Sequence, residues 1–253
     1  MAARKEAPPG SADDAKGAPA SLWERLDRPA PAPRATLTAQ RIATVGVAIA
    51  DAEGLEAITM RRLATELGVA PMAAYRYVSG KDDLLELMVD LVHGELELPD
   101  PAVGWRETLR TIALRTRALL FAHPWLARLN SPQAMLALTP NRLAVSECAL
   151  AAMAGLGLDV DTTQALARSV DLYTRGATHS EIVIQQLMAS QGWNDGDELR
   201  VGLGSQMSWL MGTGRYPVLE RHLVAAVRKD DPDWQFEVGL DCVLDGIAAR
   251  LPG

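Results

Sequence analysis

Residues 59–81 restrict the fold of this chain more than any other segment, because they carry the start and stop signals of two short helices. Thr59 can cap the first helix through its hydroxyl, and Gly68 can end it in a left-handed conformation that suits glycine. Pro71 fits the first turn of the second helix, where its missing N–H costs nothing. We predict two helices joined by a tight turn over 59–78, the second of them about two turns long.

The second predicted helix combines the small side chains Ala73 and Ala74 with long polar-tipped ones. Such a helix suits the major groove of DNA, since its backbone can come close while a few donors reach out. Four cations lie in or beside this unit: Arg61, Arg62, Arg76 and Lys81. The net charge of −7 does not oppose DNA binding, because affinity for phosphates depends on local cations.

Apolar stripes at helical spacing flank this unit on both sides. The upstream stripe, which Gly54 ends, is Ile42, Val45, Ile49 and Ala52. The downstream stripe, which Lys81 opens, is Leu84, Leu87, Met88 and Leu91. The stripes predict a three-helix N-terminal domain at 37–83 and a long helix that leaves it and enters the rest of the chain.

The order and spacing of these residues resemble the TetR family of transcriptional regulators. The similar stretch runs from Thr38 to about Leu96, and the residues that carry it are Gly54, Thr59, Arg61, Leu63, Ala64, Leu67, Gly68, Val69, Tyr75, Tyr77, Val78, Lys81, Leu84 and Leu85. Tyr77-Val78 stands where members often have His-Phe, and the tip at Met72 and Ala73 is individual to this chain. The resemblance implies a homodimer that represses transcription at a palindromic double-stranded DNA operator and is released by a small-molecule inducer.

The resemblance also implies roles for individual residues of the helix-turn-helix motif. The expected DNA-binding residues are Thr59, Arg61, Arg62, Pro71, Met72, Ala73, Tyr75, Arg76, Tyr77 and Lys81. Within this set, Arg61 and the Met72–Ala73 tip should approach base edges. Three others, Tyr75, Tyr77 and Lys81, should contact phosphates.

Residues 1–36 are rich in alanine, proline, glycine and charged residues, and we predict a disordered tail. A short helix at 21–26 is the exception, because its apolar residues could dock on the body. Three arginines of the tail leave two interpretations open, and they are Arg25, Arg28 and Arg34. They could reach into a minor groove as a basic arm, or, as we favour, remain solvated in a proline-rich linker.

Residues 84–253 show helical periodicity without a convincing strand pattern, so we predict an all-α protein whose larger C-terminal domain binds ligand and dimerises. This part resembles the tetracycline-repressor-type C-terminal domain through Gly104-Trp105-Arg106, His123-Pro124-Trp125-Leu126, Pro140-Asn141 and Gly239-Leu240-Asp241…Leu244-Asp245-Gly246. Two late apolar stripes need a covering surface, either the intrachain core or, as the resemblance implies, a second copy. The expected dimer-interface residues are Leu166, Val170, Tyr173, Leu240, Val243, Leu244, Ile247 and Leu251.

Bulky apolar side chains beside glycine-rich breaks are candidates for an inducer pocket, although such residues are more often core. The expected ligand-binding residues are Trp105, Phe121, Trp125, Met135, Met153, Tyr173, Ala177, Met188 and Trp209. They favour an apolar or aromatic inducer. The resembled repressor binds tetracycline with a metal in a histidine-rich pocket, and because no such set aligns here, tetracycline itself is not expected.

Other function classes find no support in the sequence. The four histidines stand singly, without metal-site spacing, and Walker, dinucleotide and Gly-x-Ser-x-Gly fingerprints are absent. We therefore expect no metal, no cofactor and no enzymatic activity. No apolar stretch suits a membrane span or signal peptide, so we expect a cytoplasmic protein without a membrane partner. The alternatives are a DNA-binding regulator that senses no small molecule and, less favoured, a helical enzyme or adaptor.

Overall fold

The computed structural model describes residues 21–27, 37–129 and 138–252. Within these ranges all regular structure is helical, which confirms the predicted all-α class. The α-helices are α1 (Leu22–Asp27), α2 (Ala39–Glu53), α3 (Met60–Leu67), α4 (Pro71–Ala74), α5 (Lys81–His93), α6 (Trp105–Ala122), α8 (Pro140–Met153), α9 (Val160–Gln191), α10 (Gly196–Gly212), α11 (Pro217–Ala225) and α12 (Pro232–Ala248). The 3-10 helices are η2 (Leu55–Ala57), η3 (Pro101–Val103) and η4 (Pro124–Arg128).

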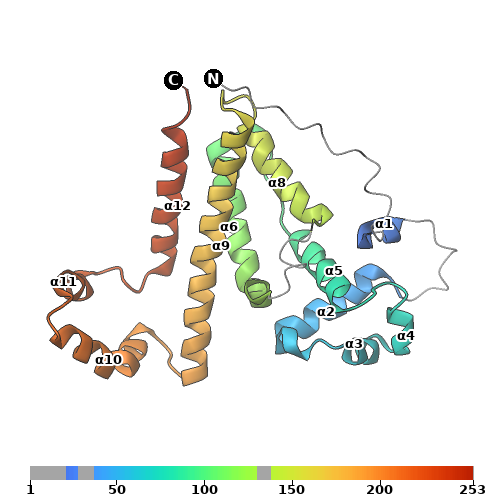
Figure 1. Cartoon of the computed structure of the whole chain (residues 1–253), viewed down its shortest axis with the longest axis horizontal. Helices are drawn as coiled ribbons and strands as arrows, with labels where there is room; N and C mark the ends of the chain where they lie inside the picture. Colours follow the sequence, from blue (N-terminus) through green and yellow to red (C-terminus); the bar gives the residue numbers. More distant parts are fainter. Residues whose placement is uncertain (1–20, 28–36, 130–137, 253) are drawn as a thin grey trace, which may run out of the picture.

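The helices form a row with α1 to α5 at one end, α6, α8 and α9 in the middle and α10 to α12 at the other end (Figure 1). Helix α5 connects the first group to the second. The domain boundary that we predicted at residue 83 falls inside the first turn of α5, so this helix belongs to both groups. None of the helices in the described part of the chain is both long and apolar enough to cross a membrane.

The first apolar cluster joins α2, α3 and α5 to the end of α6 and to η4. Its buried members include Ile42, Leu63, Leu84, Met88, Val92, Leu119, Leu120, Trp125, Leu126 and Ile182. Helices α2 and α5 approach closely at Gly46, where an added Cβ would lie 2.8 Å from the Sδ atom of Met88. The N-terminal helices are therefore packed on the same core as part of the central helices, which makes α5 a firm mechanical connection.

Helix α1 docks on this first cluster. Its Leu22 side chain is buried, Trp23 and Leu26 pack against the cluster, and Arg25 pairs with Asp83 at the start of α5. The expected short helix is therefore present, and residues 21–27 are an ordered exception within the predicted tail. The rest of that tail, including Arg28 and Arg34, lies outside the described residues, as does Met135.

The second apolar cluster joins α6, α8, α9 and α12. Its buried members are Leu109, Ala113, Met153, Val170, Phe236, Leu240, Leu244 and Ile247. Helices α9 and α12 meet closely at Gly239, where an added Cβ would lie 2.1 Å from the Tyr173 hydroxyl oxygen. That hydroxyl donates a hydrogen bond of 2.8 Å to the Phe236 carbonyl.

The second cluster contains most of the residues that we expected at a dimer interface. Val170, Leu240, Leu244 and Ile247 are 0–3% exposed, while Leu166, Tyr173 and Val243 pack against them within one chain. Leu251 is half-buried. Fully buried side chains have no surface left for a partner, so the structure corrects Val170, Leu240, Leu244 and Ile247 to intrachain core. The other four, Leu166, Tyr173, Val243 and Leu251, keep part of their surface and remain predicted interface positions. Helical periodicity identified the buried stripe but could not tell which element covers it.

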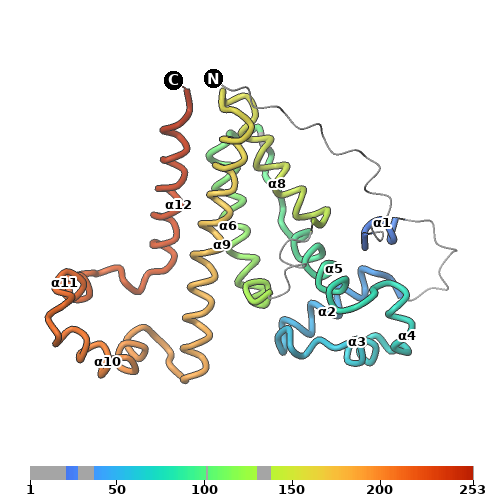
Figure 2. Tube along the Cα trace, viewed as in Figure 1, coloured from blue at the N-terminus to red at the C-terminus, as the bar shows by residue number. Residues whose placement is uncertain are grey.

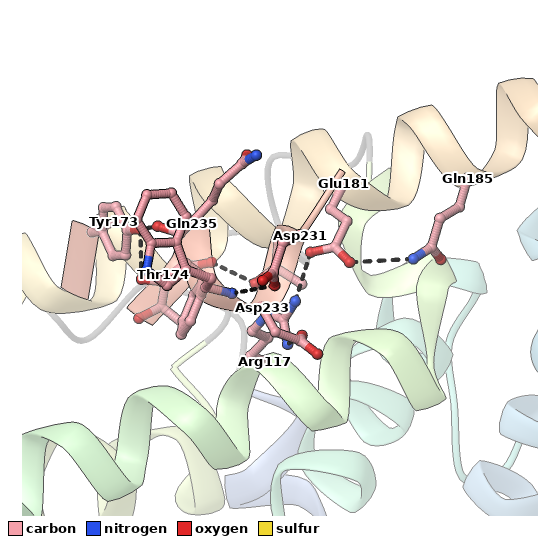
Figure 3. Close-up of polar contacts among 11 residues, drawn as sticks. Arg117, Tyr173, Thr174, Glu181, Gln185, Asp231, Asp233 and Gln235 are labelled. Atoms are coloured by element: carbon pink, nitrogen blue, oxygen red, sulfur yellow. Dashed lines mark hydrogen bonds and ion pairs between the residues drawn. The ribbon is translucent and has the colours of Figure 1, made fainter. Parts of the chain in front are cut away.

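Arg117 ties α6, α9 and the start of α12 together (Figure 3). Its guanidinium group pairs with Glu181 at 2.7 Å and with Asp233 at 2.8 Å, and it lies 4.8 Å from the ring centre of Phe236. Glu181 also accepts a hydrogen bond from Gln185. The side chains of Arg117 and Glu181 are only 15% and 17% exposed, so this pair lies largely inside the helical interface, whereas Asp233 is 78% exposed.

Helices α10 and α11 form an arm that projects from the central helices (Figure 2). Helix α10 spans Gly196–Gly212 and is capped by Asp195, whose carboxylate accepts from the Glu198 N–H. Neither α10 nor α11 has a buried residue. Large apolar side chains are exposed along the arm, among them Val201, Leu203, Met207, Trp209, Val218, Leu219, Leu223 and Val224.

Candidate nucleic-acid interface

The 59–78 segment folds as α3, a tight turn and α4, as its local signals predict. The Thr59 hydroxyl accepts a hydrogen bond of 3.1 Å from the Arg62 N–H and so caps α3. Gly68 ends α3 with φ +68°, a left-handed conformation that side chains other than glycine rarely adopt. Pro71 occupies the first turn of α4. Thr59, through its side-chain cap, and Pro71, through its ring, therefore set the starts of the two helices.

Helix α4 is shorter than we predicted. It spans four residues, and the backbone N–H groups of both Tyr77 and Val78 then donate to the Ala74 carbonyl. This bifurcated closure tightens the chain into a turn instead of a second helical turn. Because Ala74 and Val78 are fully buried, the turn is held against the first apolar cluster.

Packing of one side of this unit leaves the other side exposed. Met72 is 74% exposed and Tyr75 is 43% exposed at the tip. Ala73 and Tyr77 are half-buried and pack against the first apolar cluster. Tyr77 therefore has a structural role beside the expected phosphate contact, while Met72 and Tyr75 form the most accessible part of the tip.

The four expected cations differ in their surroundings. Arg62 is held by two carboxylates, Glu53 and Glu66, each at 2.9 Å. Lys81 is exposed and donates to the Leu55 carbonyl at 3.2 Å.

Within the described ranges, Arg61 and Arg76 are exposed and make no ion pair or hydrogen bond through their side chains. Their guanidinium groups are therefore available for phosphates or base edges. Arg62 would first have to leave Glu53 or Glu66, and we did not predict this difference from Arg61 and Arg76.

A polar cluster connects the end of α2 to the end of α6. We call Asp51, Glu95, His123 and Trp125 the interdomain polar cluster. The Nδ1 atom of His123 lies 2.8 Å from a carboxylate oxygen of Asp51, and its Nε2 atom lies 3.2 Å from a carboxylate oxygen of Glu95. The Trp125 indole N–H donates to the same Asp51 oxygen at 2.8 Å. The cluster thus joins the helix-turn-helix unit to the central helices through directed bonds.

The interdomain polar cluster was missed in the sequence, where His123 stands alone. Its partners are 72 and 28 residues away along the chain. A second connection has the same character: the backbone N–H of Asn141 donates to a carboxylate oxygen of Asp90 on α5 at 2.8 Å. The Asn141 side-chain amide also donates to the Asp90 carbonyl at 3.0 Å. Together they link α5 to the first turn of α8.

The expected ligand-binding residues do not converge on one place in this structure. Trp125 belongs to the first apolar cluster and Phe121 packs against it, whereas Met153 belongs to the second and Trp105, Tyr173 and Ala177 pack against that one. Trp209 is largely exposed on α10, and Met188 is half-buried near the end of α9. Two open hollows, of about 630 and 460 Å³, lie on the arm and beside it, and neither is lined by an expected ligand residue.

Comparisons with known proteins agree with this architecture. The family model described as bacterial regulatory proteins, tetR family, matches residues 42–88, and the tetracyclin repressor-like C-terminal domain matches residues 98–251. The HTH-type transcriptional repressor DrrR1 of Streptomyces coeruleorubidus is 36% identical over 231 residues, 89% of this chain and 83% of that relative.

Two solved structures are similar as well. The Streptomyces coelicolor TetR family protein ActR in complex with (S)-DNPA has a TM-score of 0.67 and 25% identity, over 86% of this chain and 100% of that chain. BioQ with its double-stranded DNA operator has a TM-score of 0.52 and 27% identity, over 61% of this chain and 93% of that chain.

The chain belongs to the TetR family of bacterial regulatory proteins. It is a helix-turn-helix DNA-binding transcriptional regulator, and its C-terminal part is a tetracyclin repressor-like domain. The resemblance that we inferred from the 54–85 pattern is thereby confirmed.

Proposed function

We propose that this chain is a homodimeric repressor that binds a palindromic operator and leaves it when a small apolar or aromatic molecule binds its C-terminal domain. The observation that carries the DNA-binding part is the exposed tip at Met72 and Tyr75 beside the guanidinium groups of Arg61 and Arg76, which have no partner among the described residues. Two proteins similar to this chain have been solved with such partners: BioQ with its DNA operator and ActR with a small molecule.

Within the motif we assign two kinds of contact. Arg61 and the Met72–Ala73 tip approach base edges, where a planar guanidinium can bond two acceptors of a guanine. Tyr75, Tyr77, Arg76 and Lys81 contact phosphates and set the position of the unit on the duplex. Arg62 adds a phosphate contact only after exchanging a carboxylate partner.

The exposed apolar surface supports a second copy of the chain as the partner. Exposed large apolar side chains on α9 and α12 include Leu172, Val183, Ile184, Leu187, Trp234 and Val238. Large apolar side chains are exposed on the arm as well, and exposed apolar patches mark subunit interfaces. A two-fold dimer would also bring two copies of α4 to successive major grooves about 34 Å apart.

Signal transfer would use α5, because this helix packs on α2 and is bonded to α8. A ligand among the central helices that tilts α5 would change the spacing of the two helix-turn-helix units. To release DNA, the ligand must bind the off-DNA form more tightly, by roughly 1–3 kcal/mol in a typical allosteric protein. The interdomain polar cluster would transmit the same motion through α2.

The protein acts in the cytoplasm, with the DNA that it regulates, and it performs no chemical reaction. A regulator that senses no small molecule is the alternative, and it would bind the same DNA without any ligand response.

The test has two stages. Duplexes selected from a random pool by the purified protein should contain an inverted repeat. Fluorescence anisotropy should then show that the protein binds duplexes with this repeat in preference to duplexes without it. A library of aromatic and apolar compounds should then contain members that quench tryptophan fluorescence and release the duplex over one concentration range. Tight binders that never change the DNA affinity would favour the non-sensing regulator.

A further inference from the structure

The N-terminal helix α1 lies outside both segments that the family models match, residues 42–88 and 98–251. Ser21 and Glu24 form a capping box at its start, in which each accepts the other's backbone N–H, at 3.2 and 2.7 Å. A helix of six residues is nevertheless not stable alone in water. Its Leu22 side chain is 3% exposed within the first apolar cluster, so the helical form of α1 depends on docking.

The printed polar contact between α1 and the body is made at the first turn of α5. The Arg25 guanidinium pairs with Asp83, whose side chain is 15% exposed. The Asp83 oxygen that it contacts also accepts the Ser79 backbone N–H at 2.7 Å and the Ser79 hydroxyl at 2.8 Å. Asp83 therefore joins α1 to the turn that precedes α5. We call Arg25, Asp83 and Ser79 the α1 link.

Ser79 lies inside the segment that we assign to phosphate contacts. Tyr77 comes two residues before it, and its backbone N–H closes the turn on the Ala74 carbonyl. Lys81 comes two residues after it and opens α5. Because Ser79 is exposed, apolar burial does not hold this residue in place. Its two bonds to Asp83 fix the backbone between the two expected phosphate contacts.

The start of α5 places carboxylates next to Lys81. Asp82 and Asp83 follow it directly in the first turn, and Glu86 lies about one turn further on. Burial, and next the charge of Asp83, raise the pKa of the Glu86 carboxyl, whereas the charge of Arg25 lowers it. Carboxylates at this place oppose the approach of a phosphate, since like charges repel. The cation that α1 brings to Asp83 offsets part of this repulsion.

We propose that α1 positions the phosphate-contacting segment 75–81 for operator binding, and that Arg25 is a positioning residue that acts through Asp83 and Ser79. Its guanidinium group stays on Asp83 and does not contact the DNA. Helix α1 is thus a part of the DNA-binding unit although it precedes the helix-turn-helix motif. This inference rests on the phosphate contacts assigned in the proposed function.

A double-mutant cycle of operator affinities tests this route in the full-length protein. By fluorescence anisotropy, Arg25→Ala should bind the selected inverted-repeat duplex about fivefold more weakly, which corresponds to one net hydrogen bond. In a Lys81→Ala background the same change should weaken binding by less than about twofold, because the positioned contact is already absent. Losses that add, as a direct contact of Arg25 with DNA would give, would overturn the proposal. An unchanged or higher affinity of Arg25→Ala would overturn it as well.

Two further variants separate the docking of α1 from a change in net charge. Arg250→Ala removes the same charge at an exposed position after α12 and should leave the affinity unchanged. Leu22→Asp places a charge at a buried position of α1, so it should detach the helix and weaken DNA binding at least as much as Arg25→Ala. Operator binding by a folded Leu22→Asp variant at wild-type affinity would refute a role for α1.

Hydrogen exchange distinguishes positioning from a general loss of stability. In Arg25→Ala, a peptide that covers 75–81 should exchange faster than in the wild type, because the α1 link no longer holds the Ser79 N–H. Peptides from α12, in the second apolar cluster, should keep their wild-type rates. Unchanged exchange at 75–81, or equal acceleration in both regions, would contradict a positioning role for Arg25.

The same affinities show whether the proposed function or this inference is wrong. If Lys81→Ala binds the operator as tightly as the wild type, the assigned phosphate contact is wrong, and the role of α1 is refuted with it. If Lys81→Ala weakens binding but Arg25→Ala does not, only the role of α1 is wrong.

Discussion

The bond between His123 and Asp51 should contribute measurably to the association of the helix-turn-helix unit with the central helices. The two atoms are 2.8 Å apart, and the side chains are 10% and 32% exposed. A hydrogen bond to a charged group contributes about 1.5–3 kcal/mol when well shielded. Because Asp51 is partly solvated, we expect a coupling free energy of about 1–2 kcal/mol.

A double-mutant cycle measures this coupling. The free energy of unfolding is determined by urea denaturation for the wild type, His123→Ala, Asp51→Ala and the double variant. The exposed pair Arg62–Glu66, at the similar distance of 2.9 Å, provides the control, with side chains 42% and 45% exposed. Its coupling should stay below about 0.5 kcal/mol. A His123–Asp51 coupling no larger than that of the control pair would refute the reasoning from burial.

Three further predictions follow from the structure. Arg61→Ala should reduce operator affinity by roughly 1–3 kcal/mol and relax base preference at one position per half-site. Arg62→Ala should have a much smaller effect, and competition binding to single-base operator variants measures both. Ile184→Asp should shift sedimentation toward the monomer with the fold retained, whereas Ile247→Asp should unfold the chain because Ile247 is internal. Equal loss of fold in both variants would contradict the proposed interface. Because His93 is buried and neutral in the folded state, the unfolded state binds the proton first as the pH falls from about 6.5 to 4. The free energy of unfolding should therefore drop by up to about 3 kcal/mol over this range, and urea midpoints of His93→Gln should lack this dependence.

Local signals predicted the helix-turn-helix unit well. Thr59, Gly68 and Pro71 each act on backbone groups within about four residues, and their cap, left-handed turn and helix start are all present. The predicted length of α4 was wrong, because the turn that closes on the Ala74 carbonyl depends on the burial of Val78. That burial comes from tertiary packing, which a short segment does not reveal.

Longer-range features could not be predicted in the same way. The stripe through Leu240 and Ile247 was correctly identified as apolar, but periodicity is the same whether the covering helix belongs to this chain or to a second copy. The partners of His123 come from distant elements, so its isolation in the sequence concealed them. Only the structure shows that His93 is buried and that its Nε2 atom has no partner among the described residues.

The central claim, specific DNA binding through the exposed side of α3 and α4, is tested most directly by one comparison of affinities. Fluorescence anisotropy should measure the binding of the wild type and of the Arg61→Ala/Arg76→Ala double variant to a selected inverted-repeat duplex and to a scrambled duplex, at several salt concentrations. We predict selective, salt-sensitive binding by the wild type, with selectivity lost and the salt dependence reduced in the variant. Unchanged selectivity in the variant, or equal wild-type affinity for both duplexes, would contradict the account.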